Sequence, residues 1–240
     1  AKLSPEDPSA LARLVDADPT LTAASGVGQQ LSELAGAHVD ALIGLSRLQE
    51  REGDFVKAWA SLTQANETDR RKLPAWSSSQ CSHRVISQLE TQPLPRISNL
   101  AGDRAPVFIL GMLRTGSTLL EQIHAAHAHF HPLGESAFWP REIHALGGSM
   151  LKPGRRPSPA QRAEIRTRWE EHLHERGIPT GVRVTDKRPD NLFHIVTILD
   201  VLPDAEIVVT ERDWRDTLVS VYGTRLHAQH GYATEPAAIA

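Results

Sequence analysis

A glycine-bounded segment in the middle of the chain has the residues needed to bind a phosphate. Residues 106–110 are apolar with β-branched and aromatic side chains, which is typical of a buried parallel strand. Gly111, Gly116 and two hydroxyl residues follow, and residues 119–123 continue as a helical segment. Glycines let the backbone approach an anion, and the first turn of a helix presents N–H groups to it. The segment therefore predicts a strand, an anion-binding loop and a helix.

The cation of this loop is not where ATP-binding loops have it. Their pattern places lysine after the second glycine, whereas this chain has Ser117 there and carries a positive charge inside the loop, at Arg114. On this segment alone, a strand–turn–helix with chance glycines is the alternative.

Two further cations follow predicted strands. Lys187 comes just after residues 181–185, and Arg212 just after residues 206–210. A lysine at the carboxyl end of a parallel strand faces the usual ligand crevice of an open sheet, although a surface turn would also explain Lys187. Arginine suits a phosphate because its planar fork offers paired charged donors.

Glu135 and a group of histidines are the remaining candidates for chemistry. A positioned carboxylate such as Glu135 can take the proton of an attacking hydroxyl, but a surface glutamate is the alternative. Four histidines lie close together in the sequence, namely His124, His127, His129 and His131. No cysteine or well-spaced carboxylate completes a zinc set with them, so we expect no metal site.

These elements together resemble the sulfotransferases that use 3′-phosphoadenosine 5′-phosphosulfate (PAPS). Residues 111–120 resemble their 5′-phosphosulfate loop, except that Leu113 stands where the family usually has proline. Residues 186–189 are similar to the family's Asp/Glu-Lys-x-Pro element, and residues 212–220 to its Arg-Asp…Ser element. Glu135 also matches in spacing the glutamate that serves as base in members acting on sugars or tyrosyl peptides.

The resemblance implies a role for each matching residue. The 5′-phosphosulfate would be bound by the loop, through Arg114, Thr115, Gly116, Ser117 and Thr118, and the 3′-phosphate by Arg212 and Ser220. Glu135 would deprotonate the acceptor, Lys187 would offset charge on the bridging oxygen, and Arg114 would assist transfer. The product nucleotide would be 3′-phosphoadenosine 5′-phosphate (PAP).

The first part of the chain predicts helices only. Val39, Leu42, Leu45 and Leu48 lie on one helical face, and Asp54 is a plausible N-cap for the next helix. The small residues Ala58 and Ala65 would let a neighbouring helix come close. This pair resembles one tetratricopeptide repeat, which some bacterial sulfotransferases carry. It predicts either a peptide-binding array or a helical cap on the catalytic domain.

Length and composition bound the remaining possibilities. The 240 residues carry a net charge of −3, which argues against a general nucleic-acid or anionic-membrane binder. No apolar run approaches the roughly 18 residues that span a bilayer, and we see no basic-then-apolar pattern from which to expect a signal segment. The single cysteine, Cys81, fits a reducing compartment, so we expect a cytoplasmic protein.

We therefore predict an α/β fold, a P-loop-containing parallel sheet flanked by helices and preceded by an all-α region. Residues 1–100 would form the helical region and residues 101–240 a sulfotransferase-like domain lacking its C-terminal part. The predicted activity is PAPS-dependent sulfuryl transfer to a hydroxyl. A P-loop kinase or NTPase, or a non-catalytic scaffold, is the alternative. The acceptor stays open among a sugar, a tyrosyl peptide and a small natural product, as does the oligomeric state.

Overall fold

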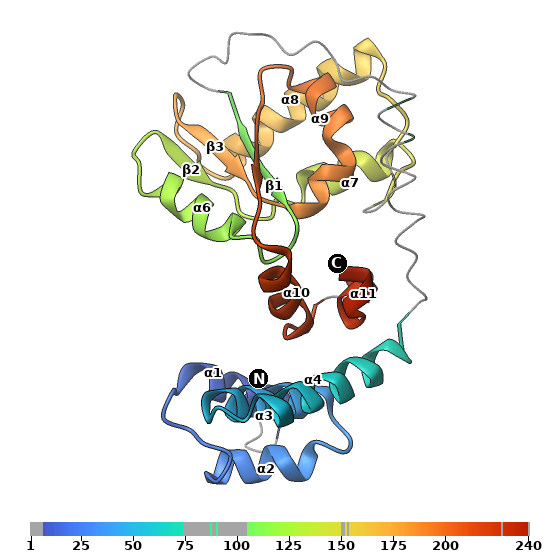
Figure 1. Cartoon of the computed structure of the whole chain (residues 1–240). Coiled ribbons are helices and arrows are strands. Elements are labelled where there is room, and N and C mark those ends of the chain that lie inside the picture. The colour runs from blue at the N-terminus through green and yellow to red at the C-terminus, as the bar shows by residue number, and fades with distance from the viewer. Residues whose placement is uncertain are drawn as a thin grey trace. The chain divides into compact units, whose positions relative to one another are not determined.

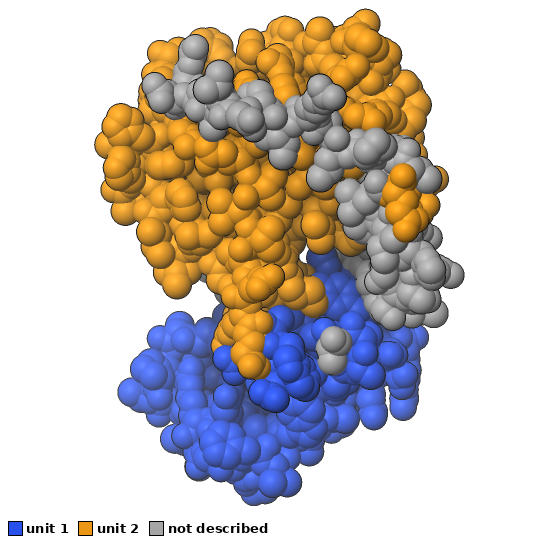
Figure 2. Space-filling view, turned by 45° about the horizontal axis from the view of Figure 1, so that its top comes forward, with its two compact units in different colours: residues 1–77, 214–240 blue, residues 78–213 orange. Residues whose placement is uncertain are grey.

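The computed structural model describes residues 7–73, 105–149, 152, 154–226 and 228–239, with positions 87 and 90. The chain divides into two compact units (Figure 2). One comprises Ala1–Ser77 together with Trp214–Ala240, and the other comprises Ser78–Asp213.

The second unit contains a sheet and its covering helices (Figure 1). Its elements are β1 (Val107–Gly111), α6 (Ser117–Ala125), β2 (Phe130–Pro132), α7 (Phe138–Ala145), α8 (Pro159–Glu175), β3 (Arg183–Asp186), the 3₁₀ helix η1 (Pro189–His194), α9 (Ile195–Val201) and β4 (Glu206–Thr210). In the part of the chain described, the sheet has the strand order β2-β3-β1-β4 and every pair is parallel. The predicted fold class is confirmed.

Helices cover both faces of this sheet. On one face, Phe108 of β1 packs against Trp139 of α7 and Trp169 of α8, with ring centroids 6.0 Å and 6.4 Å away. Thr185 of β3 is paired in register with the residue before Phe108, and successive side chains of a strand point to opposite faces. Accordingly, Thr185 donates a hydrogen bond to Glu121 of α6, which covers the other face. The central strand β1 is thus buried on both sides.

The strand β2 was not predicted from the sequence. Its three residues, Phe130–Pro132, are too short to show a period and end in proline, which a sheet tolerates at its edge. The structure places β2 at the edge beside β3. The predicted strands at 181–185 and 206–210 are present as β3 and β4.

The other unit begins with four helices, α1 (Pro8–Ala17), α2 (Gly26–Leu34), α3 (Val39–Arg51) and α4 (Phe55–Arg70). The predicted stripe on α3 is confirmed, since Leu42 and Leu48 are buried. Asp54 accepts a hydrogen bond from the Lys57 amide at the start of α4, as a cap does. Ala65 is 1% exposed and lies against α3.

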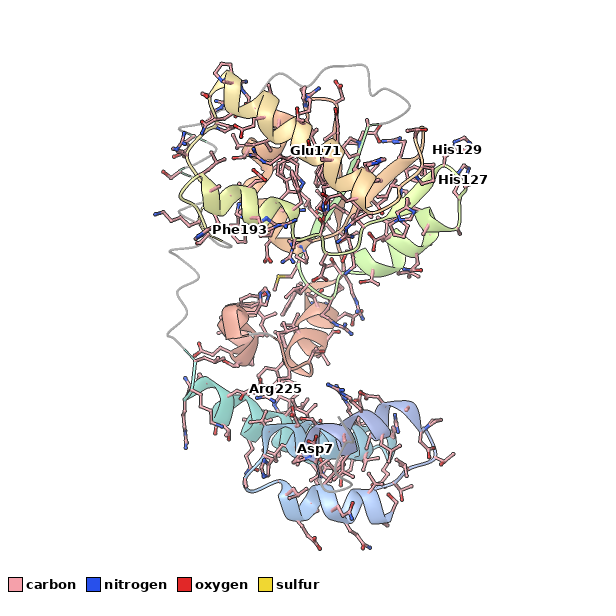
Figure 3. The ribbon with its side chains drawn as sticks, turned by 180° about the vertical axis from the view of Figure 1, so that it is seen from behind. Asp7, His127, His129, Glu171, Phe193 and Arg225 are labelled. Atoms are coloured by element: carbon pink, nitrogen blue, oxygen red, sulfur yellow. The ribbon has the colours of Figure 1, made fainter. Side chains whose placement is uncertain are left out.

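The last part of the chain packs on these helices. It comprises α10 (Trp214–Tyr222), the 3₁₀ helix η2 (Ala228–Thr234) and α11 (Pro236–Ile239). The Tyr222 ring lies 4.9 Å from that of Trp59, and Arg225 (labelled in Figure 3) pairs with Asp40 at 2.8 Å and Asp69 at 3.1 Å. These contacts explain why residues 214–240 group with the N-terminal helices. The predicted domain boundary near residue 100 stays a prediction.

Two further features of the sequence concern the single cysteine and possible membrane spans. Cys81 lies outside the described residues. None of the described helices is long and apolar enough to cross a membrane.

Candidate functional site

The loop between β1 and α6 has the backbone conformation that an anion site needs. Gly111, Arg114 and Gly116 have φ values of +147°, +70° and +98°. Among the described residues Arg114 is the only non-glycine with positive φ, a conformation that costs about 1–3 kcal/mol and is concentrated at functional sites. Helix α6 begins directly after Gly116 without a side-chain cap. Its first N–H groups therefore remain available to a bound anion.

Strand β4 fixes the loop. The Thr115 hydroxyl donates to Met112 O at 2.6 Å and lies 2.7 Å from the hydroxyl of Thr210, the last residue of β4. Thr210 in turn donates to Leu110 O at 3.1 Å. A Cβ atom on Gly111 would lie 2.4 Å from Thr210 Oγ1, so only glycine lets the two strands come this close.

Four of the predicted site residues follow four adjacent strands. In the order of the sheet, Glu135 comes after β2, Lys187 after β3, Arg114 after β1 and Arg212 after β4. Because the strands are parallel, all four residues lie on the side of the sheet where the strands have their carboxyl ends, and open α/β sheets bind ligands there. The Arg212 guanidinium donates to Arg114 O at 3.4 Å, which brings it to the loop. Along the chain these residues are far apart, and the strand order of the sheet places them after neighbouring strands.

Glu135 and Lys187 form an ion pair within this row. Lys187 Nζ lies 2.7 Å from Glu135 Oε1, and the lysine side chain is only 14% exposed. Arg188 holds the backbone beneath the pair, since its guanidinium donates to Glu135 O at 3.3 Å and to Ser136 O at 2.9 Å. A carboxylate and an ammonium group are thus fixed next to each other at the sheet edge.

Ser220 is the predicted site residue that does not belong to the sheet unit. It lies on α10, which belongs to the other compact unit. Its assignment to a 3′-phosphate therefore stays a prediction.

Asp186, directly before Lys187, is a buried carboxyl group. Its side chain is 1% exposed, and Oδ1 accepts from the Arg188 amide and from Asn191 Nδ2, both at 3.1 Å. Within the described residues Oδ2 has no hydrogen-bond partner. Burial raises the pKa of Asp186 to about 7, although these hydrogen bonds and the Arg188 charge oppose the shift.

This shift predicts a pH dependence of stability. From about pH 4 to about pH 7 the folded protein holds a proton on Asp186 that the unfolded chain has lost. The free energy of unfolding should therefore fall as the pH rises through this window, by up to about 1.4 kcal/mol per pH unit from this group. Asp186→Asn keeps the acceptor oxygen and removes the titration. Urea unfolding across the window should show a shallower slope for the variant, and an equal slope in both proteins would contradict the assignment.

Four residues at the site were given no role from the sequence: Glu121, Asp186, Arg188 and Thr210. Asp186 and Arg188 flank Lys187 and could have been found from that element. Thr210 ends a strand as an ordinary β-branched residue would. Glu121 gave no signal, because a polar residue within a helix is usually exposed, whereas this one is 2% exposed.

His127 and His129 precede β2, at the end of the strand opposite to Glu135. Figure 3 shows His127 and His129 near each other, and their ring centroids are 5.3 Å apart. Across the described ranges, no group of three histidine, cysteine or acidic residues is placed to hold a metal ion.

The fold and the loop define an α/β protein with a glycine-bounded loop and an uncapped helix start after its central strand. Comparison with known families is specific: a model described as "Sulfotransferase family" matches residues 106–238. The chain belongs to the sulfotransferase family.

A search of curated proteins gives a similar protein from Aquifex aeolicus (strain VF5), named only "Uncharacterized protein". It is 27% identical over 205 residues, which cover 78% of this chain and 26% of the relative. The chain thus spans about a quarter of that protein's length. No solved structure gives a significant match.

Proposed function

We propose that this protein transfers a sulfuryl group from PAPS to a hydroxyl acceptor by in-line displacement. The observation that carries the proposal is the row of Glu135, Lys187, Arg114 and Arg212 after four adjacent parallel strands. Such a row offers anion binding at one end and a proton acceptor at the other. Family membership supports sulfuryl transfer as the general chemistry.

In this proposal the loop binds the 5′-phosphosulfate of the donor. Arg114 supplies positive charge, and the backbone from Thr115 to Thr118 supplies N–H groups at the start of α6. Arg212, held at the loop through Arg114 O, together with Ser220 would bind the 3′-phosphate. Arginine can bind a phosphate with two parallel charged hydrogen bonds.

Glu135 and Lys187 perform the proton and charge chemistry. As the acceptor oxygen bonds to sulfur, its proton passes to Glu135. The bond from sulfur to the bridging oxygen breaks, its electron pair stays on the phosphate of PAP, and Lys187 stabilises that charge. Before the donor binds, the charges of the two groups offset each other in the 2.7 Å ion pair. We infer that Lys187 then turns from Glu135 to the donor and so frees the carboxylate to accept a proton.

For the acceptor and the protein partners we propose only the chemical class. A sugar, a tyrosyl peptide and a small natural product each offer the required hydroxyl. A peptide partner of the α1–α4 region also stays a proposal, and there the ring of Tyr222 already contacts Trp59 of α4.

Titration of the full chain with PAP, without magnesium, tests the donor site. We expect PAP to bind and ATP to bind weakly, because Ser117 replaces the lysine of ATP-binding loops. Arg114→Ala and Arg212→Ala should each weaken PAP binding by about tenfold to a hundredfold, since a hydrogen bond to a charged group contributes about 1.5–3 kcal/mol. Alanine keeps a Cβ, so the loop backbone at position 114 is under the same restraint. Isothermal calorimetry measures both affinities.

Arg176→Ala is the matched control, since this exposed arginine ends α8. Its PAP affinity should equal that of the unchanged protein. Tighter binding of ATP with magnesium than of PAP would favour a kinase or NTPase instead.

A further inference from the structure

Helix α6 buries a glutamate while it exposes two of its apolar residues. Glu121 is 2% exposed, whereas Leu119 and Ile123 on either side are 67% and 60% exposed. Burying a carboxyl group costs free energy unless hydrogen bonds compensate it, so such a residue calls for a specific reason. Simple amphipathic packing does not supply one here.

The Glu121 carboxyl group holds the turn that carries Glu135. Its Oε1 atom accepts hydrogen bonds from the Gly134 amide at 3.0 Å and from Thr185 Oγ1 at 3.1 Å. Gly134 adopts φ +66°, and its carbonyl accepts from the Lys187 amide at 3.0 Å. The residue before Glu135 is therefore held by α6 through its N–H group and by the end of β3 through its carbonyl.

We propose that Glu121 is a positioning residue for Glu135, linking the helix of the anion loop to the residue that accepts the proton. Glu121 lies one turn after Ser117, where α6 begins. The same rigid helix thus presents N–H groups to the donor and fixes the backbone of the base. The proposal rests on the proposed role of Glu135, but the contact itself can be tested without any ligand.

Amide hydrogen exchange of Gly134, measured by NMR on the full chain, is the first readout. Glu121→Met keeps the side-chain length and removes the acceptor, so the Gly134 amide should exchange at least about tenfold faster. The amide of Leu133, which donates to Thr185 O at 2.8 Å, should keep its exchange rate. Glu121→Gln retains an acceptor oxygen and should restore the protection of Gly134.

Transfer kinetics are the second readout. Sulfuryl transfer from radiolabelled PAPS should be slower in Glu121→Met through kcat, with unchanged PAP affinity and with recovery in Glu121→Gln. A merely structural role would lower the PAP affinity and kcat together. Thr185→Val, an isosteric change that removes the second hydrogen bond to Glu121, serves if the methionine variant does not fold. It should raise Gly134 exchange by a smaller factor.

The outcomes distinguish a failure of the positioning role of Glu121 from a failure of the proposed function. If Gly134 exchanges at the original rate in the Glu121→Met or, in its place, the Thr185→Val protein, the positioning role is refuted whatever the reaction is. If the unchanged protein fails to bind PAP, the proposed function fails while the exchange result still stands.

Discussion

Glu135→Gln should slow sulfuryl transfer by about 10²–10⁴-fold, the usual contribution of a general base. Glutamine fills the same volume and can still accept a hydrogen bond from Lys187, but it cannot accept the proton of the acceptor. PAP affinity should change little, because the anion loop and Arg212 remain in place. Single-turnover transfer from radiolabelled PAPS to a panel of sugars, tyrosyl peptides and small phenols measures the rate.

Glu164→Gln is the matched control for this prediction. Glu164 also forms a 2.7 Å ion pair, with Arg168, but on the surface of α8. Its loss should leave transfer unchanged, since exposed pairs contribute little to stability. Transfer by Glu135→Gln at the rate of the unchanged protein would show that another group accepts the proton.

Gly111→Ala should destabilise the sheet unit and abolish PAP binding. The new Cβ would lie 2.4 Å from Thr210 Oγ1 and 2.6 Å from Thr210 O, at a φ of +147°. The backbone strain and the overpacking each cost about 1–3 kcal/mol. Relief requires β1 and β4 to separate, which displaces the loop. Urea unfolding and PAP titration measure the two effects.

Alanine substitutions at two other glycines, Gly116 and Gly26, are the controls for Gly111→Ala. At Gly116, φ is +98° but an added Cβ meets nothing within 4 Å, so alanine there should show the backbone strain alone. At Gly26, the first residue of α2, an added Cβ again meets nothing and φ is not positive. Alanine at position 26 should leave stability unchanged or raise it by up to about 1 kcal/mol. Equal losses at positions 111 and 26 would exclude steric conflict as the cause.

Some of this structure followed from local sequence. The strand, glycine-bounded loop and helix at residues 106–123 were predicted because the apolar run, the glycines and the hydroxyl residues are contiguous. The cap at Asp54 and the α3 stripe through Leu42 were also local, since each depends on residues within a few turns of one another.

Other predictions from local pattern were incomplete. In α4, Ala58 and Ala65 are buried as expected, but local pattern does not explain why Phe55 and Trp59 are 68% and 43% exposed. Trp59 instead contacts Tyr222, far away in the sequence. Likewise the short strand β2 forms because β3 offers it backbone partners, which no period of three residues can reveal.

The sequence by itself indicated the residues that we propose for the chemistry: Arg114, Glu135, Lys187 and Arg212 each occur next to a local motif. Only the tertiary structure decided their order along one sheet edge, because strand order depends on pairings between distant segments. It also decided that Glu121 is buried. That burial requires the Gly134 amide and the Thr185 hydroxyl to converge on one carboxylate, and those partners come from separate parts of the chain.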